Sequence, residues 1–212
     1  MTGVELPGAA STAKDDPGAS AAGARPRPPL RRMSSTLRHA SHRESGKPEF
    51  ETEAIAQGQV PSRRLLTVGQ GQAPDDIAAW LGVAAGETVM IRKRLQFLDG
   101  EPAAISTSYF PLWVASGTRL ESTEPLPEGP ANLIEQLGHE FASGVELIRA
   151  RMPTPDEVRL LELGPGIPVA RLLHIDYDPQ DRTLQVADDV YAGDLHEFAF
   201  KWAEPDPPLG YA

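Results

Sequence analysis

The segment TVMIRKRLQFLDGEPAAISTSYFP, residues 88–111, decides the fold. Apolar and polar side chains alternate through its first half, and a period of two is typical of a strand whose two faces differ. The pair Asp99-Gly100 that follows favours a tight turn between antiparallel strands. The segment therefore predicts a β-hairpin, in a sheet with one packed face and one face of a different character.

Arg92 and Arg94 share one face of the first strand of this hairpin. Two residues of strand advance the chain by roughly 6.6 Å, so the two guanidinium groups could converge on one phosphate or carboxylate. We therefore take the pair as the best candidate for a ligand site. The alternative interpretation is an exposed pair on a solvated strand face, where most strand arginines lie.

The hydroxyl partners of the arginines depend on the register of the hairpin. A two-residue type I′ turn sets Thr107 opposite Arg92 and brings Thr107 and Tyr109 to the arginine face. A one-residue bulge would instead bring Ser106 and Ser108 to that face. Both pairs are therefore candidates for contacts with a ligand.

Helix signals flank the hairpin on both sides. Pro74 and the two acidic residues after it start a short helix, which Gly82 ends. Thr154 and Glu157 form a Thr-x-x-Glu capping box at the start of another helix, which Gly164 ends. A further helix is expected over 131–137, and strands are expected over 145–151, 168–177, 183–191 and 197–202. This order favours an α+β fold with an antiparallel sheet.

Charge divides the chain of 212 residues into two unequal parts. Residues 1–49 hold eight Lys or Arg against five Asp or Glu, a net of +3, whereas residues 50–212 hold twelve against twenty-five, a net of −13; together they give the net charge of −10. Nucleic-acid binding depends on clustered basic side chains, so the acidic part would repel DNA. An anionic ligand must find a local basic pocket, which again indicates the arginine pair.

Composition also limits the chemistry and the location. The chain has no cysteine, which excludes disulfides and thiolate chemistry. No apolar run approaches the roughly 18 residues of a membrane span, and the N-terminus lacks the basic-then-apolar order of a secretory signal. We therefore expect a cytoplasmic protein with no membrane partner.

Two longer runs carry a resemblance to a known family. They are APDDIAAWLGVAAGETVMIRKRLQFLDGEPAAISTSYFP, at 73–111, and ARMPTPDEVRLLELGPGIPVARLLHIDYDPQDRTLQV, at 150–186. Together they resemble the UTRA effector-sensing domain of GntR-type transcription regulators of the HutC subfamily, in particular actinobacterial members. The resemblance covers about 48–202, and it is specific because several motifs recur in the same order.

This resemblance implies a chorismate-lyase-like fold, in which helices flank a central antiparallel sheet. It also implies a small-molecule effector that alters the DNA affinity of an attached winged helix, and dimerisation through the sensor. We therefore expect no enzyme activity, no cofactor and no metal. The expected partners are the effector and a second chain, in a homodimer or in a heterodimer with an intact regulator.

The N-terminal part departs from the family pattern. Residues 1–30 are dominated by Gly, Ala, Ser and Pro, and no helical periodicity or wing hairpin precedes Pro48. We expect the winged helix to be lacking, with DNA contacted only indirectly or weakly through the basic stretch at 25–43, which is otherwise a flexible linker. The expected divisions are a disordered tail and linker at 1–47, a ligand-sensing domain at 48–204 and a C-terminal tail at 205–212.

Three further residues are candidates for effector contacts. Glu146 and Asp189 lie on predicted strands, where a carboxylate could accept hydrogen bonds from ligand hydroxyls or an amine. His196 lies in DLHEF, at 194–198, where the resemblance leads us to expect a tyrosine. The segment PANLIE, at 130–135, also lacks the hydroxyl and aromatic groups of the family's sugar-phosphate pockets. The effector is therefore expected to be another small anion, or a larger and more apolar carboxylate.

An enzyme is the main alternative. Chorismate lyase shares the fold implied by the resemblance, and the arginine pair would suit a carboxylate substrate. Catalysis needs a placed acid or base, but the sequence shows neither a nucleophile with a histidine base nor metal ligands at regular spacing. His174 lies in an apolar strand and is expected to be a hydrogen-bonded core residue rather than a ligand. A truncated dimerisation module is a further alternative.

Overall fold

The computed structural model describes residues 28–33 and 46–200. Its centre is a six-stranded sheet in the order β2-β3-β4-β7-β6-β5, in which every neighbouring pair is antiparallel. The strands are β2 (Pro61–Gln72), β3 (Thr88–Leu98), β4 (Glu101–Phe110), β5 (Ser143–Arg151), β6 (Val169–Tyr177) and β7 (Thr183–Ala192). The predicted α+β class with a central antiparallel sheet is confirmed.

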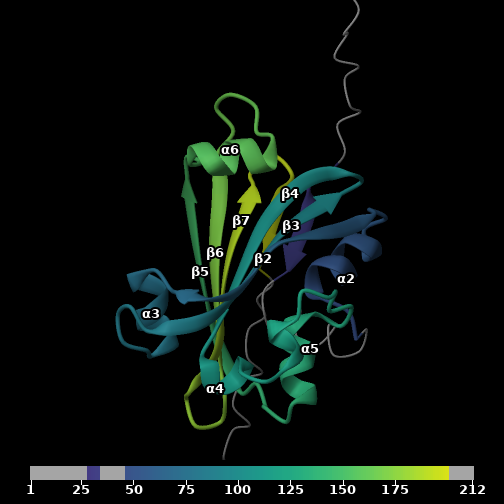
Figure 1. Cartoon of the computed structure of the whole chain (residues 1–212). Helices are drawn as coiled ribbons and strands as arrows, with labels where there is room; N and C mark the ends of the chain where they lie inside the picture. Colours follow the sequence, from purple (N-terminus) through teal and green to yellow (C-terminus); the bar gives the residue numbers. More distant parts are fainter. Residues whose placement is uncertain (1–27, 34–45, 201–212) are drawn as a thin grey trace, which may run out of the picture.

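Helices cover both faces of this sheet (Figure 1). One face carries α3 (Asp75–Leu81) and α6 (Pro155–Leu161), and the other carries α2 (Glu49–Ala56), α4 (Leu112–Ala115), the 3-10 helix η1 (Arg119–Glu121) and α5 (Gly129–Gln136). Two consecutive residues of β4 show that its side chains alternate between the two faces. Tyr109 packs in the core under α3, whereas Phe110 is fully buried under α4, η1 and α5.

A short strand precedes the sheet in sequence. β1 (Leu30–Met33) pairs in parallel with β8 (His196–Ala199), and Leu30 is fully buried against Phe50 and Leu98. The prediction that 1–47 form a disordered tail is therefore wrong for β1, because an apolar anchor and a partner strand from the far end of the chain order it. Residues 1–27, 34–45 and 201–212 lie outside the described part, and with them most of the expected N-terminal tail and linker and all of the expected C-terminal tail.

The hairpin of β3 and β4 forms with a register that differs from the simple prediction. The pairing shifts between Gln96 and Phe97, so Ser106 lies opposite Arg94 and Ser108 opposite Arg92. A bulge near the turn has this effect because it moves every later residue by one place, which exchanges the two faces of the partner strand. The type I′ register with Thr107 and Tyr109 on the arginine face is wrong, and the bulged alternative is the one observed.

The predicted capping box of α6 is present. The Thr154 hydroxyl accepts a hydrogen bond from the Glu157 main-chain N–H at 3.3 Å, and the Glu157 carboxylate accepts one from the Thr154 N–H at 2.8 Å. The helix ends earlier than predicted, because Glu162 adopts the left-handed conformation with φ 52° two residues before Gly164. Among the described helices, none is long and apolar enough to cross a membrane.

Candidate functional site

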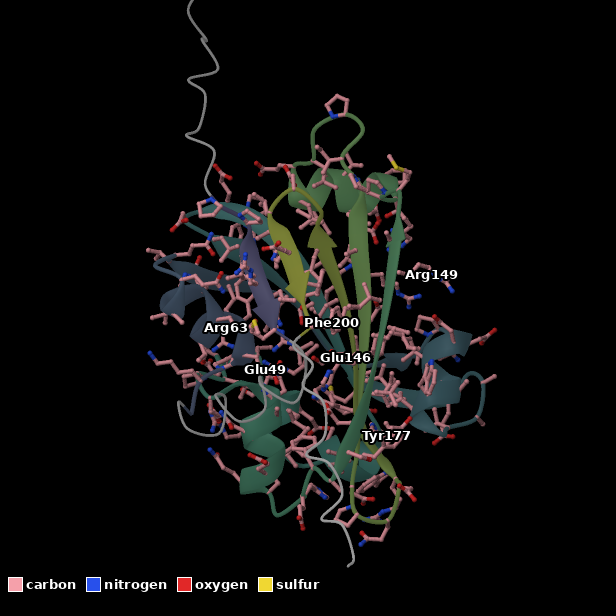
Figure 2. The ribbon with its side chains drawn as sticks, turned by 180° about the vertical axis from the view of Figure 1, so that it is seen from behind. Glu49, Arg63, Glu146, Arg149, Tyr177 and Phe200 are labelled. Atoms are coloured by element: carbon pink, nitrogen blue, oxygen red, sulfur yellow. The ribbon has the colours of Figure 1, made fainter. Side chains whose placement is uncertain are left out.

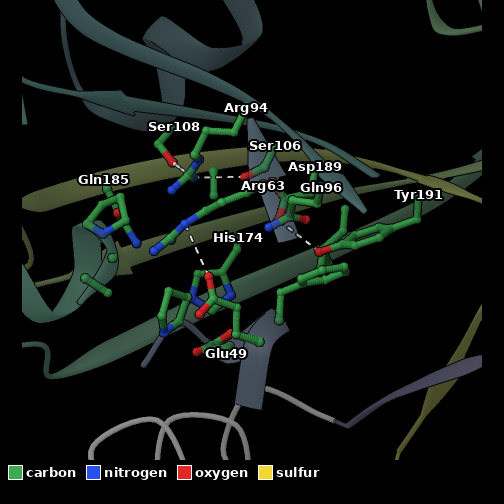
Figure 3. A pocket seen from close by; sticks show the side chains of 18 of the residues that line it. Glu49, Arg63, Arg94, Gln96, Ser106, Ser108, His174, Gln185, Asp189 and Tyr191 are labelled. Carbon is green, nitrogen blue, oxygen red and sulfur yellow. Dashed lines mark hydrogen bonds and ion pairs between the residues drawn. The ribbon is translucent and has the colours of Figure 1, made fainter. Parts of the chain in front are cut away.

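A cavity of about 110 Å³ lies between the sheet and the elements that cover its second face. Strands β3, β4, β7 and β6 form its floor, and its walls come from β1, β2, α2 and the start of α5 (Figure 3). Cross-strand pairing places Arg94, Ser106, Asp189 and Leu172 in one row across the floor, in that order. The next row runs from Ser108 to His174. The antiparallel register therefore assembles polar groups from separate strands around one space.

Arg94 is the cation of the floor. Its Nη2 donates hydrogen bonds to the Ser106 hydroxyl at 3.0 Å and to the Ser108 hydroxyl at 2.8 Å. No carboxylate of the described residues lies within 4.0 Å of its guanidinium, and its buried Nε makes no hydrogen bond there. Burial lowers the pKa of Arg94 to about 10, against the opposing charge of Asp189. The group still carries its charge at neutral pH, so it offers a fixed cation to an anion.

Arg92 shares the strand face of Arg94 but has a different environment. Its Nη1 donates to the main-chain oxygens of Leu120 at 2.8 Å and Ser122 at 2.5 Å, and the residue is only 3 % exposed. It does not line the main cavity. It lines a second cavity of about 100 Å³, together with Arg63 and Arg94. Burial, with a smaller contribution from the charge of Arg63, lowers the pKa of Arg92.

Two hydroxyl candidates face away from both cavities. Thr107 pairs with Lys93 and Asp188 across the sheet, on the face that α3 and α6 cover. Tyr109 is buried in the apolar cluster under α3, and burial raises its pKa to about 12. The corrected register explains both positions, because it places Ser106 and Ser108 on the cavity side instead.

His174 is held between two carboxylates at the far side of the floor. Its Nδ1 lies 3.0 Å from the Glu146 carboxylate and its Nε2 lies 2.7 Å from Asp176, which also accepts a hydrogen bond from Gln185 at 2.6 Å. Each ring nitrogen of His174 therefore lies within hydrogen-bond distance of a carboxylate oxygen. The prediction of a hydrogen-bonded core histidine is confirmed, but His174 also lines the cavity.

Among the described residues, Glu146 reaches the site through His174. It lies on the edge strand β5 and points to the cavity side, whereas Arg149 points to the opposite side (Figure 2). Glu146 does not line the cavity itself. Its contact with the ring fixes the orientation of His174 rather than offering a carboxylate to a ligand.

Asp189 lines the cavity and His196 does not. Asp189 Oδ2 accepts a hydrogen bond from the Tyr191 hydroxyl at 2.9 Å, while its buried Oδ1 has no hydrogen-bond partner among the described residues. His196 is buried behind Tyr191, with 4.8 Å between the ring centroids, and its Nδ1 lies 3.0 Å from the Ala192 oxygen. It therefore supports the wall of the cavity from outside.

Several lining residues were not predicted from the sequence, and Arg32 of β1 is the most distinctive. Its guanidinium lies 5.7 Å from the centroid of the Phe50 ring and 5.2 Å from that of Tyr191, and it pairs with Glu53 of α2 at 2.7 Å. Its position depends on β1 docking beside β8. The only sign of a strand here in the sequence is that Leu30 and Arg32 are two residues apart, in a segment that is otherwise typical of a linker.

Comparison with known proteins shows which family this fold belongs to. Residues 56–197 match the UTRA domain, which is about two thirds of the chain. The chain belongs to the UTRA domain family. Structures of this family therefore provide the relevant comparison, and they share the chorismate-lyase-like arrangement of helices around an antiparallel sheet.

Relatives of this UTRA domain are regulators of the GntR type. The chain is 28% identical over 187 residues to the uncharacterized HTH-type transcriptional regulator SCO4628 of Streptomyces coelicolor, covering 85% of this chain and 70% of that protein. It is 24% identical over 166 residues to the HTH-type transcriptional regulator GgaR of Escherichia coli K12, covering 70% of this chain but only 58% of GgaR.

Solved structures show the same similarity. The effector domain of PhnF from Mycobacterium smegmatis superposes with a TM-score of 0.63 and 26% identity, covering 73% of this chain and 94% of that domain. The ligand-binding domain of a protein assigned to the GntR family of transcriptional regulators, from Bordetella bronchiseptica, gives a TM-score of 0.57 and 26% identity, covering 68% of this chain and 91% of that domain.

Proposed function

We propose that this UTRA domain senses a small anionic metabolite in the cavity beneath α2 and α5, as the effector-binding part of a GntR-type regulator of the HutC subfamily. The observation that carries the proposal is the environment of Arg94. A buried guanidinium with two serine hydroxyls, and with no carboxylate of the described residues within 4.0 Å, is an incomplete ion pair. A bound anion would complete it with charge-assisted hydrogen bonds.

The size and the enclosure of the cavity support a small ligand. Its volume of about 110 Å³ and its position beneath α2 and α5 suit a compact metabolite rather than a peptide or a nucleic acid. The acidic surface of residues 50–212 disfavours DNA on this domain. Transcription would therefore be modulated through an attached or partner DNA-binding unit, since allostery requires two coupled sites. A dimer formed through the sensor stays a prediction.

Binding without turnover separates the sensor from an enzyme. The one histidine that lines the cavity, within the described residues, has both ring nitrogens engaged by carboxylates. A histidine whose two ring nitrogens both contact carboxylates has a structural role and is poorly placed to exchange a proton with a substrate. A true effector should therefore be recovered chemically unchanged after prolonged incubation with the protein.

Thermal unfolding against a panel of small anions tests the proposal. Dicarboxylates, sugar phosphates and aromatic acids form the panel, and Arg94→Gln is compared with Lys93→Gln on the opposite face of the same strand. At about 100 times its dissociation constant an effector stabilises the fold by roughly 2.7 kcal/mol, a shift of several degrees. The proposal requires that Arg94→Gln lose this shift and that Lys93→Gln keep it. Equal shifts in both variants would place the anion elsewhere.

A further inference from the structure

Arg94 and Asp189 carry opposite charges in the cavity floor, but they do not form an ion pair with each other. They lie on either side of Ser106 in one row of the sheet, on β3 and β7, with β4 between them. Neither makes an ion pair within 4.0 Å among the described residues, although the charge of Asp189 acts on Arg94. Two strand spacings separate their backbones by roughly 9.6 Å, which leaves room for a small molecule between the two head groups.

Two buried acceptors at this end of the cavity make no hydrogen bond in the described part of the chain. They are Oδ1 of Asp189 and Oε1 of Gln96, and both residues line the cavity. A buried acceptor that has left water and found no donor is costly, and more so when it is charged. A ligand that supplies N–H or O–H donors at this point would remove that cost.

The other carboxylates around the cavity are already engaged. Asp176 contacts His174 and accepts a hydrogen bond from Gln185, and Glu51 pairs with Arg63 at 3.2 Å. Glu49 has interactions of its own. Among the described carboxylates that line the cavity, Asp189 is therefore the one with a buried oxygen open to a ligand, although its charge also acts on Arg32 and Arg94.

We propose that the ligand is zwitterionic, with an acidic group bound by Arg94 and its two serines and an ammonium group bound by Asp189 and Gln96. This inference rests on the proposed function of the same cavity and specifies its ligand class. An ammonium group supplies three donors and one positive charge, which matches two open acceptors and one carboxylate without an ion pair within 4.0 Å among the described residues. A hydroxyl would satisfy the hydrogen bonds but not the charge, and a purely anionic ligand would meet repulsion at Asp189.

A matched series of compounds tests this ligand class on the full chain. The probes are glycine, β-alanine, γ-aminobutyrate and 5-aminovalerate, each compared with the acid that lacks its amine and with the amine that lacks its acid. The series varies the distance between the two charges while keeping their chemistry. We expect at least one zwitterion to bind more tightly than both of its partners, measured by thermal shift and calorimetry.

Two variants assign the contacts. In Asp189→Asn the preferred zwitterion should bind about tenfold more weakly. Its acid partner should bind at least as tightly as before, because the repulsion from Asp189 is removed, and this binding also shows that the variant is folded. Asp194→Asn, an exposed change of the same kind, should leave both unchanged. Arg94→Gln should abolish binding of both compounds.

The outcomes separate the two proposals. If no zwitterion in the series exceeds its acid partner, or if Asp189→Asn weakens both equally, the zwitterion inference is wrong while an anion site at Arg94 stands. The zwitterion inference is also wrong, and the anion site at Arg94 stands, if dicarboxylates or sugar phosphates bind more tightly than every zwitterion. If Arg94→Gln leaves acid binding intact, the proposed sensing site is itself wrong.

Discussion

The guanidinium of Arg92 is bound to the main-chain oxygen of Leu120 at 2.8 Å, across the gap between β3 and η1. Arg94, two residues later on the same face, touches serine hydroxyls and open space instead. The two arginines lie on the same face of β3 but have different roles. The first ties η1 and the loop after it to the sheet, and the second is the one that we propose binds the ligand.

Arg92→Met should destabilise the protein. The change removes two hydrogen bonds and leaves the oxygens of Leu120 and Ser122 without their donor, so we expect a loss of about 2–4 kcal/mol in the free energy of unfolding. Urea denaturation measures it. Arg149→Met on the exposed edge strand is the control and should change stability by less than about 0.5 kcal/mol. A similar small effect at both positions would show that Arg92 does not hold η1.

Arg32 and Glu53 should behave as a coupled buried pair. Their side chains are 4 % and 8 % exposed and 2.7 Å apart, so Arg32→Met leaves a buried carboxylate and should cost about 3–5 kcal/mol. The double change Arg32→Met with Glu53→Met should cost much less than the sum of the single changes. A double-mutant cycle from chemical denaturation gives the coupling, and simple additivity would contradict the pairing.

Gly129→Ala should disturb the wall of the cavity. Gly129 has φ 79°, and a Cβ there would lie 2.9 Å from Cγ of Pro48, at the entry to α2. Gly138→Ala is the matched control, because its φ is 92° and nothing lies within 4 Å. Both changes strain the backbone, so the further loss at Gly129, about 1–3 kcal/mol, measures the contact with Pro48. Equal Tm values for the two variants would argue against that contact.

Glu157 should make stability depend on pH in acid. Burial alone would raise its pKa, but two hydrogen bonds from Arg151, at 2.6 and 2.7 Å, and one from Thr154 hold the pKa below its ordinary 4.5. A lowered pKa means that the unfolded chain binds the proton first, so the stabilisation is present above pH 4.5 and is lost as the pH falls through the folded value.

Glu157→Gln tests this dependence. At neutral pH we expect the variant to be less stable by about 1 kcal/mol, since the site is partly exposed. The difference should shrink as urea denaturations are carried to lower pH. Asp156→Asn, an exposed neighbour, should leave the pH profile of the parent unchanged. A constant difference at every pH would show that the charge of Glu157 is not the cause.

The elements predicted from sequence are those with strong local signals. The alternation in β3, the capping box at Thr154 and the apolar runs of β6 and β7 each determine their own structure. β2 lacked such a signal, because its second half contains Gly69 and Gly71 among polar residues and it is an edge strand held mainly by pairing with β3. β1 depends on contacts with the other end of the domain.

The site shows the same division between local pattern and tertiary placement. Arg94 and Asp189 were candidates because strand alternation identifies polar residues on a packed sheet. The choice between the serines and the Thr107 pair depended on one bulge beside Pro102, which alternation along the strands does not reveal. Arg32 and Tyr191 could not be assigned, since their place at the cavity follows from how strands distant in sequence meet.

The wall formed by Arg32 and the first turn of α2 lies upstream of residue 56, where the match to the UTRA domain begins. A domain trimmed to residues 56–197 would therefore keep the cavity floor with Arg94 and Asp189 but would lose one wall of the cavity. β1 and the start of α2 thus enclose one side of the cavity and lie on the N-terminal side of the matched residues. We therefore expect a ligand that shifts this wall to displace β1 and the start of α2 directly, on the N-terminal side of the matched domain.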